Sequence, residues 1–386
     1  MAYALMMLGS GVQLPFLPLW LAAKGIDAPG IAFIVAGMMA IRMVSAPLFG
    51  WVADHFHKRR QVIIGCAVMA FMTYSGLGFV EGFWPIALMA LAASFFFAPV
   101  FPLSESYSVD ASAALGLDYG RMRLWASLSF LTGSLGSGAL LTKLDALDTV
   151  WLMAGAMGLS VLSTFLLPAE PEALGRPKPK AASSMGAARF LFATSFPLFL
   201  LAAGLAQASH GMMYSFSSMH WQSLGFSSLV IGLMWAVAVM AEVSLLAFSN
   251  RVIERFGPGT IFLAGITGGA VRWLLLSFVE SLPVLLVLQT LHAASFAMTH
   301  LGTMHMIRLM VPERLRNRAQ ALHAALSGGI LMSTSIWASG PLYHHFGAKT
   351  YLAMMGILAC GAADCGAAAA RQPQSAGGGG YMRLPS

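Results

Sequence analysis

Residues 50–60 of this chain read Gly-Trp-Val-Ala-Asp-His-Phe-His-Lys-Arg-Arg, and a degenerate copy, Asn-Arg-Val-Ile-Glu-Arg-Phe-Gly, stands at residues 250–257. The acidic residues of the two copies, Asp54 and Glu254, are 200 positions apart. Trp84-Pro85 and Leu282-Pro283 repeat at a similar spacing of 198. We therefore predict that the chain is a duplication whose two halves share one order of helices.

Both copies lie between long apolar stretches. Each stretch approaches the ~20 residues that a helix needs to cross the hydrocarbon core of a bilayer. There are twelve of them, at residues 3–23, 30–52, 61–80, 84–108, 123–142, 150–168, 196–219, 227–249, 260–279, 283–307, 320–342 and 350–370. We predict an all-α membrane protein with twelve transmembrane helices in two pseudo-symmetric six-helix bundles.

Positive charges mark alternate gaps between these stretches. Seventeen of the 22 Lys and Arg residues lie in every second gap or in the tail, whereas the other gaps hold only Lys24, Lys143 and Lys349. Because basic residues in short loops stay on the cytoplasmic side, we predict that the basic gaps are cytoplasmic. An even number of spans puts both termini there, in a multi-pass protein of the inner (cytoplasmic) membrane.

The composition excludes several other classes of protein. The chain is 58% hydrophobic and only 10% charged, whereas a soluble domain has about 25% charged residues. Contact with anionic lipid headgroups accounts for the net charge of +7, so no nucleic acid partner is expected. The three cysteines lack the spacing of metal ligands, and no catalytic constellation is visible, so we expect no metal, no cofactor and no enzyme.

The polar gaps also divide the chain into segments. Residues 1–168 are predicted to form the N-terminal bundle and residues 196–370 the C-terminal bundle. Residues 169–195, the longest polar gap, contain several prolines and basic residues and are predicted to be a cytoplasmic linker. Residues 371–386 include four consecutive glycines and are predicted to be a disordered cytoplasmic tail.

The loop pattern Gly-x-x-x-Asp-x-x-x-Lys-Arg after the second stretch, its copy and the two sets of six helices resemble the major facilitator superfamily. The chain departs from the family loop at His57 and at Asn250, where the family prefers Gly. The resemblance implies two bundles that expose a central substrate site alternately to each side, as a monomer. It also implies a gating loop, formed by Gly50, Asp54, Lys58 and Arg59.

Asp54 fits such a gate because a carboxylate at the cytoplasmic end of a helix can hold basic groups while the inner side is closed. In the simpler interpretation, the loop only anchors the helices at the membrane surface.

Few ionisable residues lie inside the predicted spans. Each costs at least ~2.5 kcal/mol near the bilayer centre, so those that occur usually face a cavity and pair with another group. They include Arg42, Glu105, Glu242, Arg272 and several histidines. We expect them to mark a substrate pathway.

Glu105 and Arg123 are predicted to lie at the cytoplasmic ends of adjacent antiparallel helices. The segment Gly-Arg-x-Arg-x-Trp-Ala-Ser around Arg123, with a carboxylate 18 residues before that arginine, resembles lactose permease and its relatives. The resemblance implies that this pair contributes to substrate binding. A structural salt bridge between two helices is the alternative.

Arg272 and His292 stand 20 residues apart on the ninth and tenth stretches. This resembles an Arg and a His of lactose permease, which implies a role in proton coupling and binding. The carboxylate that the permease carries one turn after its His is replaced by Ser295. We therefore predict Glu242 and His292 as the proton-coupling residues, with a permanent Glu242–Arg272 ion pair as the alternative.

Polar and aromatic residues recur along the seventh stretch at three- and four-residue steps, which would put them on one helical face. The set comprises Gln207, His210, Tyr214, Ser217 and Trp221. We predict that this face forms a cavity wall, with His210, Tyr214 and Trp221 in contact with substrate.

Several of these segments, together with Asp-Tyr-Gly-Arg-Met-Arg-Leu-Trp at residues 118–125, resemble the 3-phenylpropionate transporter branch. The resemblance implies proton-coupled uptake of a small aromatic carboxylate, with the proton gradient as driving force and protons, a small molecule and lipid as partners. Arg123, Arg272 or Arg42 would bind the carboxylate. A nucleoside or oligosaccharide proton symporter, and a non-transporting membrane sensor on the same scaffold, are the alternatives.

Overall fold

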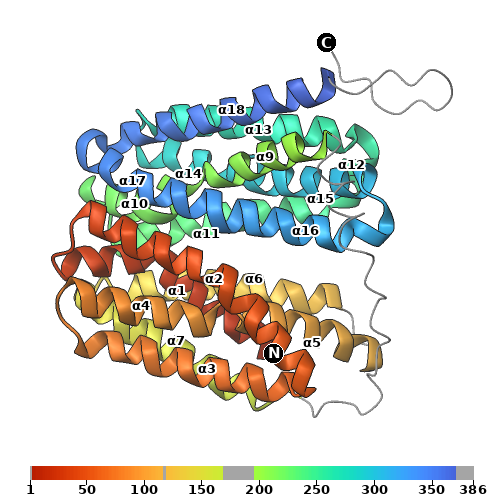
Figure 1. The fold of residues 1–386 in the computed structure, drawn as a ribbon. Coiled ribbons are helices and arrows are strands. Elements are labelled where there is room, and N and C mark those ends of the chain that lie inside the picture. The colour runs from red at the N-terminus through yellow and green to blue at the C-terminus, as the bar shows by residue number, and fades with distance from the viewer. Residues whose placement is uncertain (1, 116–118, 168–194, 371–386) are drawn as a thin grey trace. The chain divides into compact units, whose positions relative to one another are not determined.

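The computed structural model describes residues 2–115, 119–167 and 195–370, and their side chains over residues 5–109, 125–167 and 195–362. Within these ranges every regular element is helical, as the sequence predicts (Figure 1). The predicted linker and tail lie outside the described residues, as does the side chain of Arg123.

Helices occupy all of the predicted apolar stretches. The first six correspond to α1 (Ala2–Ala23), α2 (Ala28–Phe56), α3 (Arg59–Gly76), α4 and α5 (Phe83–Phe97 and Val100–Leu115), α6 (Tyr119–Leu140) and α7 (Thr149–Thr164). The next three correspond to α9 and α10 (Phe196–Ala208 and Gly211–Ser223), α11 (Ser228–Ala247) and α13 (Pro258–Leu276). The short helix α12 (Ser249–Phe256) precedes α13.

The last three stretches are less regular. The tenth consists of α14 (Leu282–Thr290), the π-helix η3 (Ala293–Met298) and α15 (Thr299–Met310). The eleventh consists of α16 (Arg316–Ala324), the π-helix η5 (Ala325–Leu331) and α17 (Met332–Phe346). The twelfth is α18 (Thr350–Ala370). In the described part of the chain, nine helical segments are long and apolar enough to cross a membrane.

Contacts divide the chain into two compact units. The first contains α1 to α7, α10, α11 as far as Val239, and α17 from Ile336 onward. The second contains α9, α11 from Met240 onward, α12 to α16, the start of α17, and α18. The bounds of these units differ from those of the predicted halves, residues 1–168 and 196–370. The division into units by contacts does not test the predicted halves, which stay a prediction.

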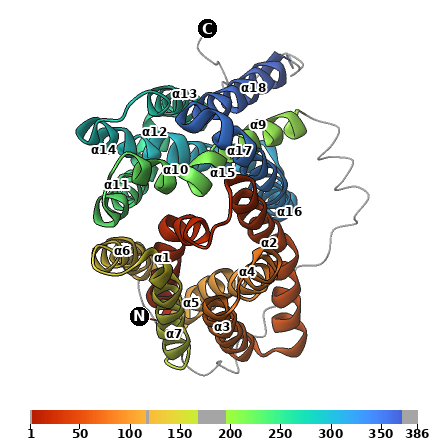
Figure 2. The same cartoon turned by 90° about the vertical axis from the view of Figure 1, so that its left-hand side faces the viewer.

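In the first unit α1 packs against α6 and α7, and α3 packs against α4 and α7 (Figure 2). Glycines permit the closest of these contacts. A Cβ atom on Gly11 would lie 2.3 Å from the Phe130 carbonyl oxygen, and one on Gly133 would lie 2.4 Å from that of Leu8. The backbones of α1 and α6 therefore touch, which small residues at a helix contact permit.

In the second unit α9 packs against α18, and α13 packs against α15, η3 and α18. Large apolar side chains on both units remain exposed, among them Leu88, Leu162, Val287 and Leu309, each 65% exposed. Such side chains on outer helix faces are suited to contact with lipid.

Two turns at equivalent positions of the predicted copies are alike. Gly25, with φ 80°, ends α1, and Gly225, with φ 85°, ends α10. The hydrogen bonds match one for one: Gly25 N donates to Ala22 O and Gly225 N to Gln222 O, both at 2.9 Å. The following helix is then capped in each copy, by Asp27 Oδ1 accepting from Gly30 N and by Ser227 Oγ accepting from Val230 N.

Candidate functional site

Two groups of polar side chains occur inside the helical segments, one in each compact unit. The first, which we name the Arg272 cluster, consists of Arg272, His292, Glu242, Ser295, Gln289 and His210, all in the second unit. The second, which we name the Arg42 cleft, belongs to the first unit.

Arg272, on α13, is completely buried. Its Nη1 donates to His292 Nδ1 and to Ser295 Oγ, both at 3.0 Å, and its Nη2 donates to Gln289 Oε1 at 2.8 Å. The guanidinium also lies 4.9 Å from the ring centre of Trp273, which adds a cation–π contact. The protein thus replaces much of the hydration of this cation.

His292 lies between the cation and an acid. Its Nδ1 accepts from Arg272, so Nε2 carries the proton of the neutral ring. Nε2 faces Glu242 Oε2 on α11 at 3.7 Å. The Glu242 side chain is 21% exposed, whereas that of His292 is 6% exposed. The cluster therefore runs from the buried guanidinium through the imidazole to a partly accessible carboxylate.

A second branch leads from Arg272 to His210. Ser295 Oγ accepts from Arg272 and lies 3.2 Å from His210 Nε2, while His210 Nδ1 donates to the Gln207 carbonyl oxygen at 3.1 Å. These contacts are compatible with one neutral tautomer, in which the serine hydroxyl donates to His210 Nε2. His210 is fully buried.

Local backbone geometry places Ser295. It lies within the π-helix η3, and π-helical turns are frequent at functional sites. Glycines of α13 allow this turn to approach closely: a Cβ atom on Gly265 would lie 2.8 Å from Thr299 N and 2.9 Å from Ala294 O. The Ser295 hydroxyl can therefore reach Arg272 on α13.

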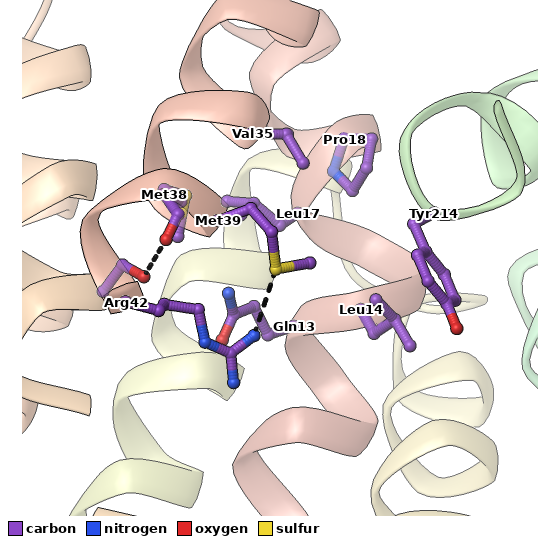
Figure 3. Close-up of a pocket in the computed structure, with 10 residues that line it drawn as sticks. Gln13, Leu14, Leu17, Pro18, Val35, Met38, Met39, Arg42 and Tyr214 are labelled. Atoms are coloured by element: carbon purple, nitrogen blue, oxygen red, sulfur yellow. Dashed lines mark hydrogen bonds between the residues drawn. The ribbon is translucent and has the colours of Figure 1, made fainter. Parts of the chain in front are cut away.

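The Arg42 cleft holds about 70 Å³ of space for water-sized molecules (Figure 3). Arg42 on α2 is exposed, and among the described side chains its Nη1 donates to the Met39 thioether, at 3.4 Å. Tyr214 and the Gln13 amide also line the cleft. The remaining lining residues are Leu14, Leu17, Pro18, Val35, Met38, Met39 and Ser94.

The predicted stripe of the seventh span is divided between the two compact units, and its role as a cavity wall stays a prediction. A turn at Ser209 and His210 separates α9 from α10. Gln207 and His210 belong to the second unit, whereas Tyr214 lines the Arg42 cleft in the first. Trp221 is only 1% exposed and packs edge-on to Trp235 with ring centres 6.4 Å apart.

Glu105 lies on α5 and is half-buried. Because the Arg123 side chain is outside the described residues, the predicted pairing of these two residues stays a prediction.

In the predicted gating loop, Gly50 and Asp54 lie on α2. Lys58 occupies the N-cap position of α3 without a side-chain capping hydrogen bond, and Arg59 is the first residue of that helix. Arg59 Nη2 pairs with Asp54 Oδ1 at 2.9 Å.

Sequence reasoning missed Gln13, Tyr74 and Gln289, although each is a polar residue in an apolar stretch. Tyr74 is fully buried, and its hydroxyl donates to Gln13 Oε1 at 2.7 Å. Gln289 is also fully buried. Amides and phenols are common enough in helices that only the structure separates these three from ordinary packing residues.

The helical fold and the polar groups inside its spans define a multi-pass membrane transporter. The chain belongs to the MFS_1 like family, whose model matches residues 1–353, and thus to the major facilitator superfamily. It is similar to the probable 3-phenylpropionic acid transporter of Escherichia coli (strain K12), with 28% identity over 351 residues that cover 89% of this chain and 90% of the relative. It is also 24% identical to the maltose permease of Geobacillus stearothermophilus over 370 residues, 92% of each chain.

Solved structures agree with this fold. The nucleoside transporter NupG gives a TM-score of 0.81 at 16% identity, covering 96% of both chains. The D-xylose-proton symporter gives 0.71 at 15% identity, covering 93% of this chain and 94% of that one. These structures show the fold, while the family match and the similar transporter show that the protein is a transporter and not an enzyme.

Proposed function

We propose that this protein is a proton-coupled transporter of a small aromatic carboxylate, of the class of 3-phenylpropionate, and that it works by alternating access. The Arg272 cluster carries the proposal, because it joins two groups that bind protons, Glu242 and His292, to a fixed buried cation. The similar transporter for 3-phenylpropionic acid supports the substrate class.

The geometry offers a way to couple a proton to a change of structure. His292 accepts from Arg272 at Nδ1, so a proton added there would place two donors face to face and break this hydrogen bond. A proton on Glu242 would remove the negative charge beside His292 Nε2. Either protonation would change the hydrogen bonds and charges around Arg272. Alternation between the protonated and the deprotonated state of the cluster would then drive transport.

We place the protein in the inner (cytoplasmic) membrane with both termini in the cytoplasm, because the basic gaps follow the positive-inside rule. The Asp54–Arg59 pair, at 2.9 Å, would then lie at the cytoplasmic surface as part of the gating loop. A monomer with one substrate pathway is sufficient for this mechanism.

A proton symporter of sugars or nucleosides is the second candidate. The similarity to a maltose permease, and the shared fold with a xylose-proton symporter and a nucleoside transporter, favour it. The same arginine and glutamine groups would then bind hydroxyls.

The test is uptake by purified protein in liposomes with an imposed inward proton gradient. We expect labelled 3-phenylpropionate to accumulate, and unlabelled aromatic carboxylates to compete. Maltose, xylose and nucleosides should not compete at similar concentrations. Uptake of a sugar or nucleoside in place of any carboxylate would favour the second candidate, and accumulation that ignores the gradient would exclude proton coupling.

A further inference from the structure

Arg42 and Arg272, the two arginines inside the predicted apolar stretches 30–52 and 260–279, differ in how they are bound. Arg272 is fully buried, and its guanidinium already bonds with His292, Ser295 and Gln289. Arg42 is exposed to the cleft and donates to the sulfur of Met39, which is a weak acceptor. Over the described side chains no carboxylate pairs with Arg42. A guanidinium in a transmembrane helix without an anionic partner indicates a partner from outside the protein.

A second donor, the amide of Gln13, lines the same cleft as Arg42. Tyr74 donates to Gln13 Oε1, which leaves the Gln13 amide nitrogen, with its two N–H groups, as the free end of that side chain. This nitrogen has no acceptor among the described residues. Gln13 and Arg42 both belong to the lining of this one cleft (Figure 3). The cleft thus presents donors from two side chains and no acidic acceptor.

Apart from Ser94, whose hydroxyl donates to the Met38 carbonyl oxygen at 2.7 Å, the rest of the lining is largely apolar. Leu14, Leu17, Pro18, Val35, Met38 and Met39 form it, with the Tyr214 ring on one side. The space for water-sized molecules, about 70 Å³, is below the roughly 300 Å³ of a typical ligand pocket. A ligand must therefore displace side chains, and the flexible methionines are suited to that. Such a site matches a small anion with an apolar body.

We propose that Arg42 and Gln13 bind the carboxylate of the transported substrate, that Leu17, Met39 and Tyr214 contact its apolar body, and that Tyr74 positions Gln13. This inference rests on the proposed function, and it assigns anion binding to Arg42 rather than to Arg272. The guanidinium supplies charge and paired donors, and the amide supplies one more donor to the second oxygen.

The assignment is tested by equilibrium binding of labelled 3-phenylpropionate to the full-length protein in nanodiscs, compared with its neutral amide, 3-phenylpropionamide. The wild type should prefer the carboxylate. Arg42→Gln should weaken carboxylate binding roughly 10- to 100-fold, because a charge-assisted interaction is lost. Binding of the amide should change by less than about threefold, since the amide makes no ion pair. This selective loss also shows that the variant is folded.

Two further variants sharpen the test. Tyr74→Phe releases the Gln13 amide and should weaken carboxylate binding by about threefold to tenfold, with a smaller effect on the amide. Arg251→Gln removes an exposed arginine of α12, whose guanidinium lies 5.9 Å from the centre of the Phe248 ring, and should leave both affinities unchanged. If Arg42→Gln does not fold, Tyr74→Phe and Gln13→Leu test the same site.

The outcomes separate the two proposals. If Arg42→Gln keeps the wild-type preference for the carboxylate, the assignment of Arg42 is overturned, whatever the transport assay shows. If the preference collapses in Arg42→Gln but wild-type uptake ignores the proton gradient, the anion site stands and proton coupling fails. Transport that loses its carboxylate selectivity only in Arg272→Gln would move the anion site to the Arg272 cluster.

Discussion

At the scale of single residues, the protein holds two cations in two different ways. Arg272 donates to His292, Ser295 and Gln289, and of these three acceptors only His292 can change its protonation. Arg42 faces a cleft and remains available to an incoming anion. In this proposal Arg42 binds the anion and the Arg272 cluster couples the proton. Arg42 can then select against an uncharged substrate without any change in the Arg272 cluster.

His57 shows how one residue can be strained by its position. It is the only non-glycine residue with positive φ, at 53°, within the described ranges, and it ends α2. Gly257 occupies the same place in the second copy, with φ 75°. Because a side chain disfavours this conformation, His57→Gly should raise the free energy of unfolding by about 1 kcal/mol.

Thermal unfolding in detergent measures this effect as a higher Tm. His55→Gly is the matched control, because it puts glycine inside the last turn of α2 and should destabilise the protein by about 1 kcal/mol. Equal effects of the two changes would contradict the assignment of strain to His57.

At the scale of elements, glycines and irregular turns set how closely helices approach. The contact of α1 with α6 depends on Gly11 and Gly133, and the approach of η3 to α13 depends on Gly265. The π-helical turn then delivers Ser295 to Arg272. These contacts determine which side chains meet inside the spans.

Gly133→Ala tests the first of these contacts. The new methyl group would collide with the Leu8 carbonyl of α1, so we expect a loss of about 1 to 3 kcal/mol of stability. Gly136→Ala on the same helix meets nothing within 4 Å and should be neutral or stabilising by up to about 1 kcal/mol. Thermal unfolding of the two variants decides the matter, and indistinguishable Tm values would show that α1 and α6 are not in backbone contact.

The loop between α2 and α3 offers a test of gating. The Asp54–Arg59 pair is largely exposed, and such pairs add only about 0 to 1 kcal/mol to stability. Asp54→Asn should therefore leave Tm and membrane insertion almost unchanged but slow uptake several-fold. Glu81→Gln, which removes an exposed acid from the loop before α4, is the control and should transport normally. Wild-type rates in Asp54→Asn would mean that the loop is only an anchor.

At the scale of the whole molecule, the sequence alone predicts the helical fold, because long apolar stretches and the copy of residues 50–60 at residues 250–257 leave few alternatives. The sequence also predicts that Arg272, His292 and Glu242 lie near one another, because charged groups inside membrane helices usually pair. In the structure these three residues lie in one cluster. The sequence does not predict the turn at Ser209 and His210 or the π-helix at Ser295. Both depend on tertiary contacts and hydrogen bonds that helical periodicity does not encode.

The central claim is that the Arg272 cluster couples a proton to transport, and Glu242→Gln tests it most directly. The variant keeps the shape of the side chain but cannot release a proton, and Glu254→Gln, an exposed acid of α12, serves as the control. In liposomes, Glu242→Gln should abolish gradient-driven accumulation of 3-phenylpropionate while exchange of labelled for unlabelled substrate continues. Accumulation at the level of the wild type and of Glu254→Gln would contradict the account.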